Sequence, residues 1–196
     1  MTTSSTPKPD LPTLFFATPA EWQAWLDAHY AQDQGVWLKF AKKASGIRSV
    51  VYDEALDVAL CYGWIDGQSK SLDETYYLQK FTPRRARSIW SLRNVGKIAE
   101  LTKAGKMKPS GVAAVEAAKA DGRWEQAYAS PANSTVPEDF EAALKANPKA
   151  KAFYETLNKT NVYAVLWRIY TAKKPETRAA RIEKLVAMLA AGEKLH

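Results

Sequence analysis

Apolar residues first fall into a regular pattern in residues 18–29, where they recur at the spacing of one helix face. Trp22, Trp25, Leu26 and His29 stand at positions i, i+3, i+4 and i+7 of that segment. The segment opens with Thr-Pro-Ala-Glu, which supplies a capping residue, a proline at the first helical position and a glutamate three residues after the cap. The pattern predicts a helix that buries this aromatic face, with His29 at the edge of the core.

Three short runs have the alternation, or the β-branched and aromatic content, that is typical of strands. Residues 36–40 alternate in type, and the runs 65–72 and 75–81 are joined by Asp-Glu in a way that predicts a hairpin. Between them, residues 53–61 begin with two acids and are apolar nearly all round. We expect a buried central helix there, stopped at Gly63.

The remainder of the chain has helical patterns. Proline at the first helical position recurs at Pro137, Pro148 and Pro175. The predicted helices are 88–104 or 91–104, 109–121, 137–146, 148–157, 161–172 and 175–191. The sequence therefore predicts an α+β fold, with a small mixed or antiparallel sheet and helices followed by an all-helical C-terminal half.

Composition along the chain divides it into three parts. Residues 1–13 are rich in Thr, Ser and Pro and are expected to be a disordered tail. Residues 14–130 form the predicted α+β domain, and residues 136–192 form a predicted helical domain. The linking segment, residues 130–136, is rich in small and polar residues.

Positive charge is concentrated in one stretch. The net charge of the chain is +7, yet residues 80–108 hold nine cations and one acid, Glu100. Such a field favours phosphates, nucleic acid or carboxylates as partners, and salt screens it over roughly 10 Å. The nine cations are Lys80, Arg84, Arg85, Arg87, Arg93, Lys97, Lys103, Lys106 and Lys108.

The densest mixture of chemically versatile side chains lies between Cys61 and Asn94. Indole rings supply stacking surface, arginines bind anions with paired donors, and hydroxyls give directional hydrogen bonds. Ser88 and Ser91 stand at the entry to a predicted helix, where free backbone amides favour anions. We therefore predict a pocket for a small anionic ligand of the phosphate or carboxylate type. The residues predicted to line it are Trp64, Asp66, Arg84, Arg87, Ser88, Trp90 and Asn94.

Other roles for these residues stay open. Trp64 and Trp90 are large enough to be core residues, and Asp66 could form a structural ion pair with Arg84 or Arg87. An enzyme that acts on a small anionic substrate through Asp66 or Cys61 is a further hypothesis, because a thiol near cations can have a lowered pKa. The position of Cys61 near the C-terminal end of its helix disfavours a thiolate, so a buried structural thiol is the favoured interpretation.

The sequence contains no metal-ligand spacing, no nucleophile–base pair and no phosphate-binding loop motif. We therefore assign no catalytic residue, metal or cofactor, and favour a binding protein over an enzyme. Cys61 is the only cysteine, which fits a reducing compartment. The first thirteen residues hold no apolar run of an export signal, so we expect a cytoplasmic protein without membrane insertion. The oligomeric state is left open.

The motifs together resemble the YdeI/OmpD-associated family, also described as bacteriocin-protection proteins. The resemblance extends over about residues 14–192, and its C-terminal part is similar to the short helical domain that defines the family. The motifs that carry it are Trp22-x-x-Trp25-Leu26, Val36-Trp37-Leu38, the runs 54–56 and 59–67, Thr82-Pro83-Arg84, Ser88-Ile89-Trp90-Ser91, Asn94, Gly122-Arg123-Trp124, Pro137-x-Asp139-Phe140, Ala143-Leu144 and Glu176-Thr177-Arg178-x-x-Arg181-Ile182.

The resemblance implies protection against bacteriocins or cationic peptides and association with an outer-membrane porin, and it brings no reaction, cofactor or catalytic residue. The leading hypothesis is a cytoplasmic binding protein, linked to envelope-stress tolerance, that holds a small anion in its Arg/Trp pocket. One alternative is nucleic-acid binding through the basic residues 80–108. The other is the enzyme that acts through Asp66 or Cys61.

Overall fold

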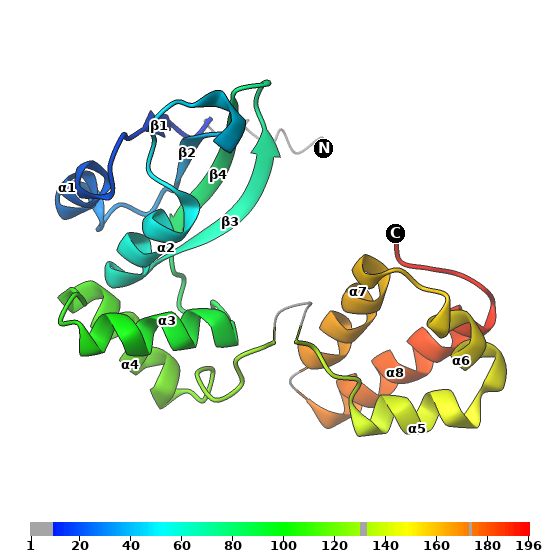
Figure 1. The fold of residues 1–196 in the computed structure, drawn as a ribbon. Coiled ribbons are helices and arrows are strands. Elements are labelled where there is room, and N and C mark those ends of the chain that lie inside the picture. Colours follow the sequence, from blue (N-terminus) through cyan, green and yellow to red (C-terminus); the bar gives the residue numbers. More distant parts are fainter. Residues whose placement is uncertain (1–9, 130–132, 173) are drawn as a thin grey trace, which may run out of the picture. The chain divides into compact units, whose positions relative to one another are not determined.

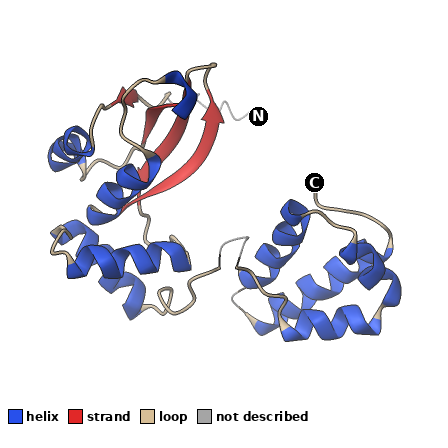
Figure 2. Cartoon of the chain, viewed as in Figure 1, coloured by secondary structure: helices blue, strands red, loops and turns tan. Residues whose placement is uncertain are grey.

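The structure, a computed structural model, describes residues 10–129, 133–172 and 174–196, and the chain divides into two compact units between Ala127 and Tyr128. The fold is α+β, as predicted. All the strands of the described residues lie in the N-terminal unit, and the described part of the C-terminal unit is helical (Figure 2).

The N-terminal unit contains a four-stranded mixed sheet with the order β1-β2-β4-β3. β1 runs parallel to β2, while β4 pairs antiparallel with both β2 and β3 (Figure 1). A register shift between Asp66 and Ser69 interrupts the β3–β4 hairpin. The strands are β1 (Thr13–Phe15), β2 (Val36–Ala41), β3 (Trp64–Ser71) and β4 (Tyr76–Pro83).

β1 was not predicted, and it begins inside the expected tail. Its three residues are too few to show an alternating pattern. The strand is held by its pairing with β2, next to which the Trp37 amide donates to the Pro12 carbonyl at 2.9 Å. Residues 1–9 of the predicted tail, and residues 130–132 of the predicted link, lie outside the described residues.

Two helices of this unit begin where their capping residues predict. Thr18 accepts a hydrogen bond from the Glu21 amide, and Ser91, rather than Ser88, caps the helix that leads from the basic segment. The described helices are α1 (Pro19–His29), α2 (Tyr52–Cys61), α3 (Leu92–Lys103) and α4 (Pro109–Ala120), with a short 3-10 turn, η1 (Lys43–Ser45).

The core lies between α1, α2 and one face of the sheet, which we call the inner face. Side chains of alternate strand residues point into it, as the period of two requires. Its fully buried members include Trp22, Leu38, Leu56, Trp64 and Phe81. His29, expected at the edge of this core, is exposed instead and stacks on Trp25 at 4.4 Å between ring centroids.

α4 approaches the end of α2 at a glycine. A Cβ at Gly111 would lie 2.1 Å from the Cys61 carbonyl oxygen, so only glycine lets the two backbones come this close. Gly63, at φ +77°, reverses the chain after α2 and leads it directly into β3. The predicted stop at Gly63 is therefore confirmed.

The C-terminal unit has its own core between four helices. Phe140, Val165, Leu166, Ile169 and Leu189 are fully buried there. The helices are α5 (Glu138–Ala146), α6 (Pro148–Glu155), α7 (Lys159–Tyr170) and α8 (Pro175–Ala190). Across the described part of the chain, no helix has the length and apolar character needed to span a membrane.

Two arginines near the start of α8 tie this unit together. Arg178 donates to both oxygens of Asp139 on α5, at 2.6 and 2.8 Å, and also to the Ile169 carbonyl at 3.2 Å. Arg181 donates to the Arg168 carbonyl at 2.6 Å. Both guanidinium groups thus satisfy carbonyls in the last turn of α7, where positive charge also complements the helix dipole.

Candidate functional site

Trp64, the first residue of the predicted site, is sealed inside the core. Its side chain has no exposed surface, and its indole N–H donates to the Tyr30 carbonyl at 2.9 Å. The ring lies edge-on to Trp22 and Trp25 on α1. Trp64 therefore anchors the loop that follows α1 and has no surface that a ligand could reach.

Arg84 and Trp90 do come together, but they contact each other. The guanidinium carbon of Arg84 lies 3.4 Å from the Trp90 ring centroid, and one of its nitrogens donates to the Ile89 carbonyl at 3.1 Å. Trp124 packs against the same indole at 4.9 Å between centroids, leaving Trp90 1% exposed. Arg84 as a residue is partly exposed, but the Nε and Nη2 atoms of its guanidinium are buried against this pair of rings.

The segment between these residues is a fixed turn. The Ser88 hydroxyl accepts from the Arg85 amide at 3.0 Å, and its carbonyl accepts from Arg123 at 2.8 Å. Arg123 is itself held by Asp121, at 2.8 and 2.7 Å to the two carboxylate oxygens. Arg87, at the tip of this turn, is exposed. Arg123 was not predicted as a site residue, although it lies in one of the quoted motifs.

Asp66 and Asn94 serve other contacts. Asp66 accepts a hydrogen bond from the Tyr52 hydroxyl at 2.7 Å, and burial together with this bond raises the pKa of Tyr52. Asn94 is 6% exposed in the first turn of α3, and its backbone N–H donates to the Ser91 hydroxyl. The structure thus distributes the predicted residues among separate contacts, and Arg84 is the one that connects them to a pocket.

The pocket beside Arg84 has a volume of about 470 Å³. It lies between the loop that follows α1 and the end of β4, and three cations from one short stretch line it: Lys80, Arg84 and Arg85. Asp33 is the one acid among its lining residues. The other lining residues are Leu11, Tyr30, Ala31, Gln32, Gln34, Gly35, Thr82 and Pro83. We call this cavity the Arg84 pocket.

Backbone packing holds the two walls of the Arg84 pocket together. A Cβ at Gly35 would lie 2.4 Å from both the Phe81 carbonyl oxygen and the Thr82 methyl carbon. The loop from Tyr30 is further fixed by the indole of Trp64 and by a hydrogen bond from Gln32 to the Gln34 carbonyl at 2.9 Å. The pocket walls are therefore set by the fold before any ligand arrives.

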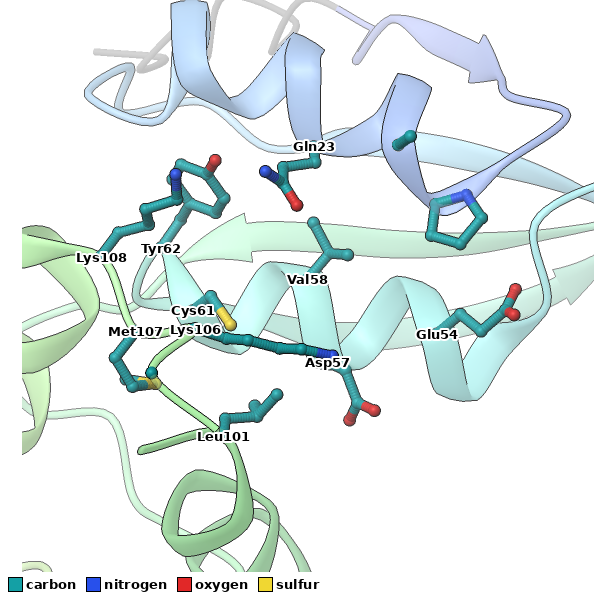
Figure 3. A pocket seen from close by; sticks show the side chains of 13 residues that line it. Gln23, Glu54, Asp57, Val58, Cys61, Tyr62, Leu101, Lys106, Met107 and Lys108 are labelled. Carbon is teal, nitrogen blue, oxygen red and sulfur yellow. The ribbon is translucent and has the colours of Figure 1, made fainter. Parts of the chain in front are cut away.

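A second pocket, of about 760 Å³, opens between α1, α2 and the loop before α4 (Figure 3). Lys106 extends across it beside Cys61 (Figure 3). Its charged lining residues are two acids, Glu54 and Asp57, and two cations, Lys106 and Lys108. The lining is therefore electrically balanced, in contrast to the Arg84 pocket.

Cys61 and Tyr62 line this second pocket without showing the chemistry of a nucleophile. Burial raises the pKa of the Cys61 thiol, and the nearby Lys106 and Lys108 offset this only in part. The Tyr62 hydroxyl donates to Asp27 at 2.5 Å, and burial with this bond raises its pKa too. A neutral thiol at neutral pH gives no support to Cys61 as a catalytic residue.

The basic stretch is partly neutralised by acids from α1 and α2. Lys97 lies 2.6 Å from Asp57, and Arg93 pairs with Asp53. Lys108 lies 3.5 Å from Asp27. The high charge of residues 80–108 in sequence is therefore not a single open field in space. Within the described residues, no cluster of three or more His, Cys, Asp or Glu side chains could hold a metal ion.

Comparison with known families agrees with this division of the chain. Residues 14–114, more than half of the chain, match a family described as a domain of unknown function, DUF8412. The chain therefore belongs to that family. This match contains the second pocket, the segment from Cys61 to Asn94, and all of the lining of the Arg84 pocket except Leu11.

Residues 133–192 match the family described as Bacteriocin-protection, YdeI or OmpD-Associated. This confirms the resemblance drawn from the motifs and locates it on the four helices of the C-terminal unit. The motifs from Trp22 to Asn94 fall instead within the match to the domain of unknown function, and Gly122-Arg123-Trp124 lies outside both matches. No curated protein and no solved structure matches the chain.

Proposed function

We propose that this protein binds a small anion, of the phosphate or carboxylate type, in the Arg84 pocket. The observation that carries the proposal is the convergence of Lys80, Arg84 and Arg85 on one cavity with Asp33 as the one acid in its lining. A preformed concave site with a few convergent polar groups is the usual form of a small-ligand site. Excess positive charge selects an anion for it.

The three cations differ in how they would bind. Arg84 is held by its stack on Trp90 and its hydrogen bond to Ile89, and its Nε and Nη2 atoms are buried, so it contributes a fixed positive charge to the pocket wall. Lys80 and Arg85 have no side-chain hydrogen bond or ion pair in the described part of the chain, so they can turn toward a ligand. Arg84 would give charge from a fixed position, and the other two would give both charge and hydrogen bonds to the ligand.

The larger pocket fits an anion less well. Its lining includes two carboxylates on α2, Glu54 and Asp57, which would repel a phosphate or carboxylate in the same space, and Lys106 reaches toward Asp57 (Figure 3). The other lysine of the lining, Lys108, lies 3.5 Å from Asp27. For these reasons we assign the anion to the smaller pocket, and Lys106 supplies a matched control position.

At the level of the cell, we propose that this binding serves tolerance to bacteriocins or envelope stress, in the cytoplasm. The match of residues 133–192 to the bacteriocin-protection family supports the first part. The single buried cysteine, Cys61, fits a reducing compartment.

Isothermal titration calorimetry with inorganic pyrophosphate tests the proposal. Lys80→Met and Arg85→Gln should each weaken binding roughly tenfold, because each removes a charged hydrogen bond. Lys106→Met is the control and should leave the affinity unchanged. Binding that survives both pocket variants and is lost in Lys106→Met would transfer the anion to the second pocket, and an absence of heat in wild-type protein would overturn the proposal.

A further inference from the structure

The face of the sheet opposite α1 and α2 carries aromatic and cationic side chains in alternation. We call it the outer face and define it by Phe15, Trp37, Lys39, Lys70, Tyr76 and Lys80, whose registers place them on the side away from the core. Figure 1 shows both helices on the other side of the sheet. Phe15 is 40% exposed, and Trp37 and Tyr76 are partly exposed.

The rings and lysines of the outer face contact one another rather than the core. Lys39 lies over both Phe15 and Tyr76, at 5.3 and 4.5 Å from the ring centroids. Lys70 lies 4.4 Å from the ring centroid of Trp37. Leu78, between them on β4, is 4% exposed and yet stands apart from the main core cluster. Within the described residues of the N-terminal unit, the outer face is thus a second, shallow apolar layer on which lysine side chains lie over the rings.

The outer face has one sign of charge. Asp66 is the only acid in the four strands, and it points to the inner face, where it accepts a hydrogen bond from Tyr52. Lys80 belongs both to this face and to the lining of the Arg84 pocket, and Thr82, two residues further along β4 on the same side, also lines that pocket. The stacking surface and the anion pocket are therefore continuous.

We propose that the outer face binds a single-stranded nucleic acid, with bases stacked on Phe15, Trp37 and Tyr76 and a phosphate in the Arg84 pocket. This inference rests on the proposed function, and it identifies the anion in the Arg84 pocket as a phosphate of the nucleic-acid backbone. Single-strand binders combine aromatic platforms with a basic track for the backbone. A four-stranded sheet of this size presents room for two or three bases.

The cation–π contacts of the outer face can be exchanged for contacts with a nucleic acid. A base has a flat face that can replace the ammonium of Lys39 or Lys70 above a ring. The displaced ammonium can then pair with a neighbouring phosphate, so its charge remains neutralised. A duplex hides its base faces inside its own stack, and this surface would offer it only the lysines.

The test is a fluorescence anisotropy titration of the full chain with labelled dT12 and U12, beside a 12-base-pair duplex and inorganic pyrophosphate. Both single strands should bind, more tightly than the duplex, with affinity that falls log-linearly with salt. Trp37→Leu should weaken single-strand binding about tenfold, since one stacking platform is lost. Trp167→Leu, at a partly exposed tryptophan of the C-terminal unit, is the matched control.

The outcomes separate the inference from the function on which it rests. If Trp37→Leu binds dT12 as tightly as wild type while Arg85→Gln does not, the anion pocket stands and the stacking platform is wrong. Equal affinity for duplex and single strand would overturn the inference. So would sedimentation that shows wild type to be a dimer and Trp37→Leu a monomer, because the outer face would then be a dimer interface. A protein that binds neither pyrophosphate nor oligonucleotide would refute both.

Discussion

Arg84 has two roles that the sequence alone did not separate. Its guanidinium covers Trp90 at 3.4 Å and also lines the pocket proposed for an anion. A residue that both supports a fold and faces a ligand is expected to affect stability and binding together when it is removed. Its neighbour Arg87 is exposed at the tip of the turn and offers a contrast.

Arg84→Ala should lower the free energy of unfolding by about 1–2 kcal/mol, because Trp90 loses its cation–π partner and its cover. Urea denaturation of the full chain measures this loss. Arg87→Ala should unfold like wild type. An Arg84→Ala protein with unchanged stability would mean that the stack on Trp90 contributes nothing to the fold.

Two glycines should respond oppositely to the same substitution. Gly111→Ala introduces a Cβ 2.1 Å from the Cys61 carbonyl oxygen and should cost about 1–3 kcal/mol of stability by overpacking. Gly96→Ala lies in the exposed interior of α3 with open space around it and should add about 0.5–1 kcal/mol. Thermal unfolding compares them, and a Gly111→Ala protein as stable as Gly96→Ala would contradict the close contact of α2 and α4.

At the scale of elements, the sequence predicted the helices and the three longer strands, because each has its own period and its own capping or turn residues. It missed β1, whose three residues show no period, and it missed the loop wall of the Arg84 pocket. That wall approaches β4 through Gly35, and no local pattern reveals which distant backbone a glycine will meet.

The predicted site shows the same limit. Arg84 and Trp90, both in the short segment after β4, were expected to line one pocket, and in the structure they contact each other. Lys80 and Arg85 were noted only as part of the basic stretch, and the acids that neutralise Arg93 and Lys97 come from α2, forty residues earlier. The number of charges in a segment can be counted from the sequence, but which of them form ion pairs depends on the fold.

The ion pair between Asp139 on α5 and Arg178 on α8 should make the free energy of unfolding depend on pH. The hydrogen bonds from Arg178 hold the pKa of Asp139 below its ordinary value of 3.8. Because the folded-state pKa is depressed, the stabilisation is present above the ordinary value and is lost as the pH falls through the lower, folded value. At neutral pH it should be on the order of 1 kcal/mol, since the pair is partly exposed.

Asp139→Asn tests this dependence. Urea denaturation should show wild type more stable than the variant by a constant amount above about pH 5, and the gap should close at lower pH. Glu183→Gln, on an exposed part of α8, is a control for general charge removal. A gap that widens on acidification would contradict the assignment of Arg178 as the cause.

At the scale of the whole molecule, each unit buries its own set of large apolar side chains. The core of the C-terminal unit is built from Phe140, Leu166, Ile169 and Leu189 on α5, α7 and α8, together with Ala150 on α6. We propose that this unit is an independent domain, which agrees with the extent of its family match, residues 133–192.

Residues 128–196 expressed alone should therefore fold, with a helical circular dichroism spectrum and a cooperative thermal transition. A small helical domain of this length can be stable by itself, although only marginally. The variant Phe140→Ala should abolish the transition, because it empties the centre of the core. A wild-type fragment without a cooperative transition would mean that the unit depends on the rest of the chain.

The central claim, that an anion occupies the Arg84 pocket, is tested most directly by an NMR titration of the ¹⁵N-labelled chain with inorganic pyrophosphate. Chemical-shift changes locate the ligand on the backbone without a change of sequence. We predict the largest changes at Gly35, Thr82, Arg84 and Arg85, which surround the pocket. Changes centred on Cys61 and residues 105–108, or no saturable change at any amide, would contradict the account.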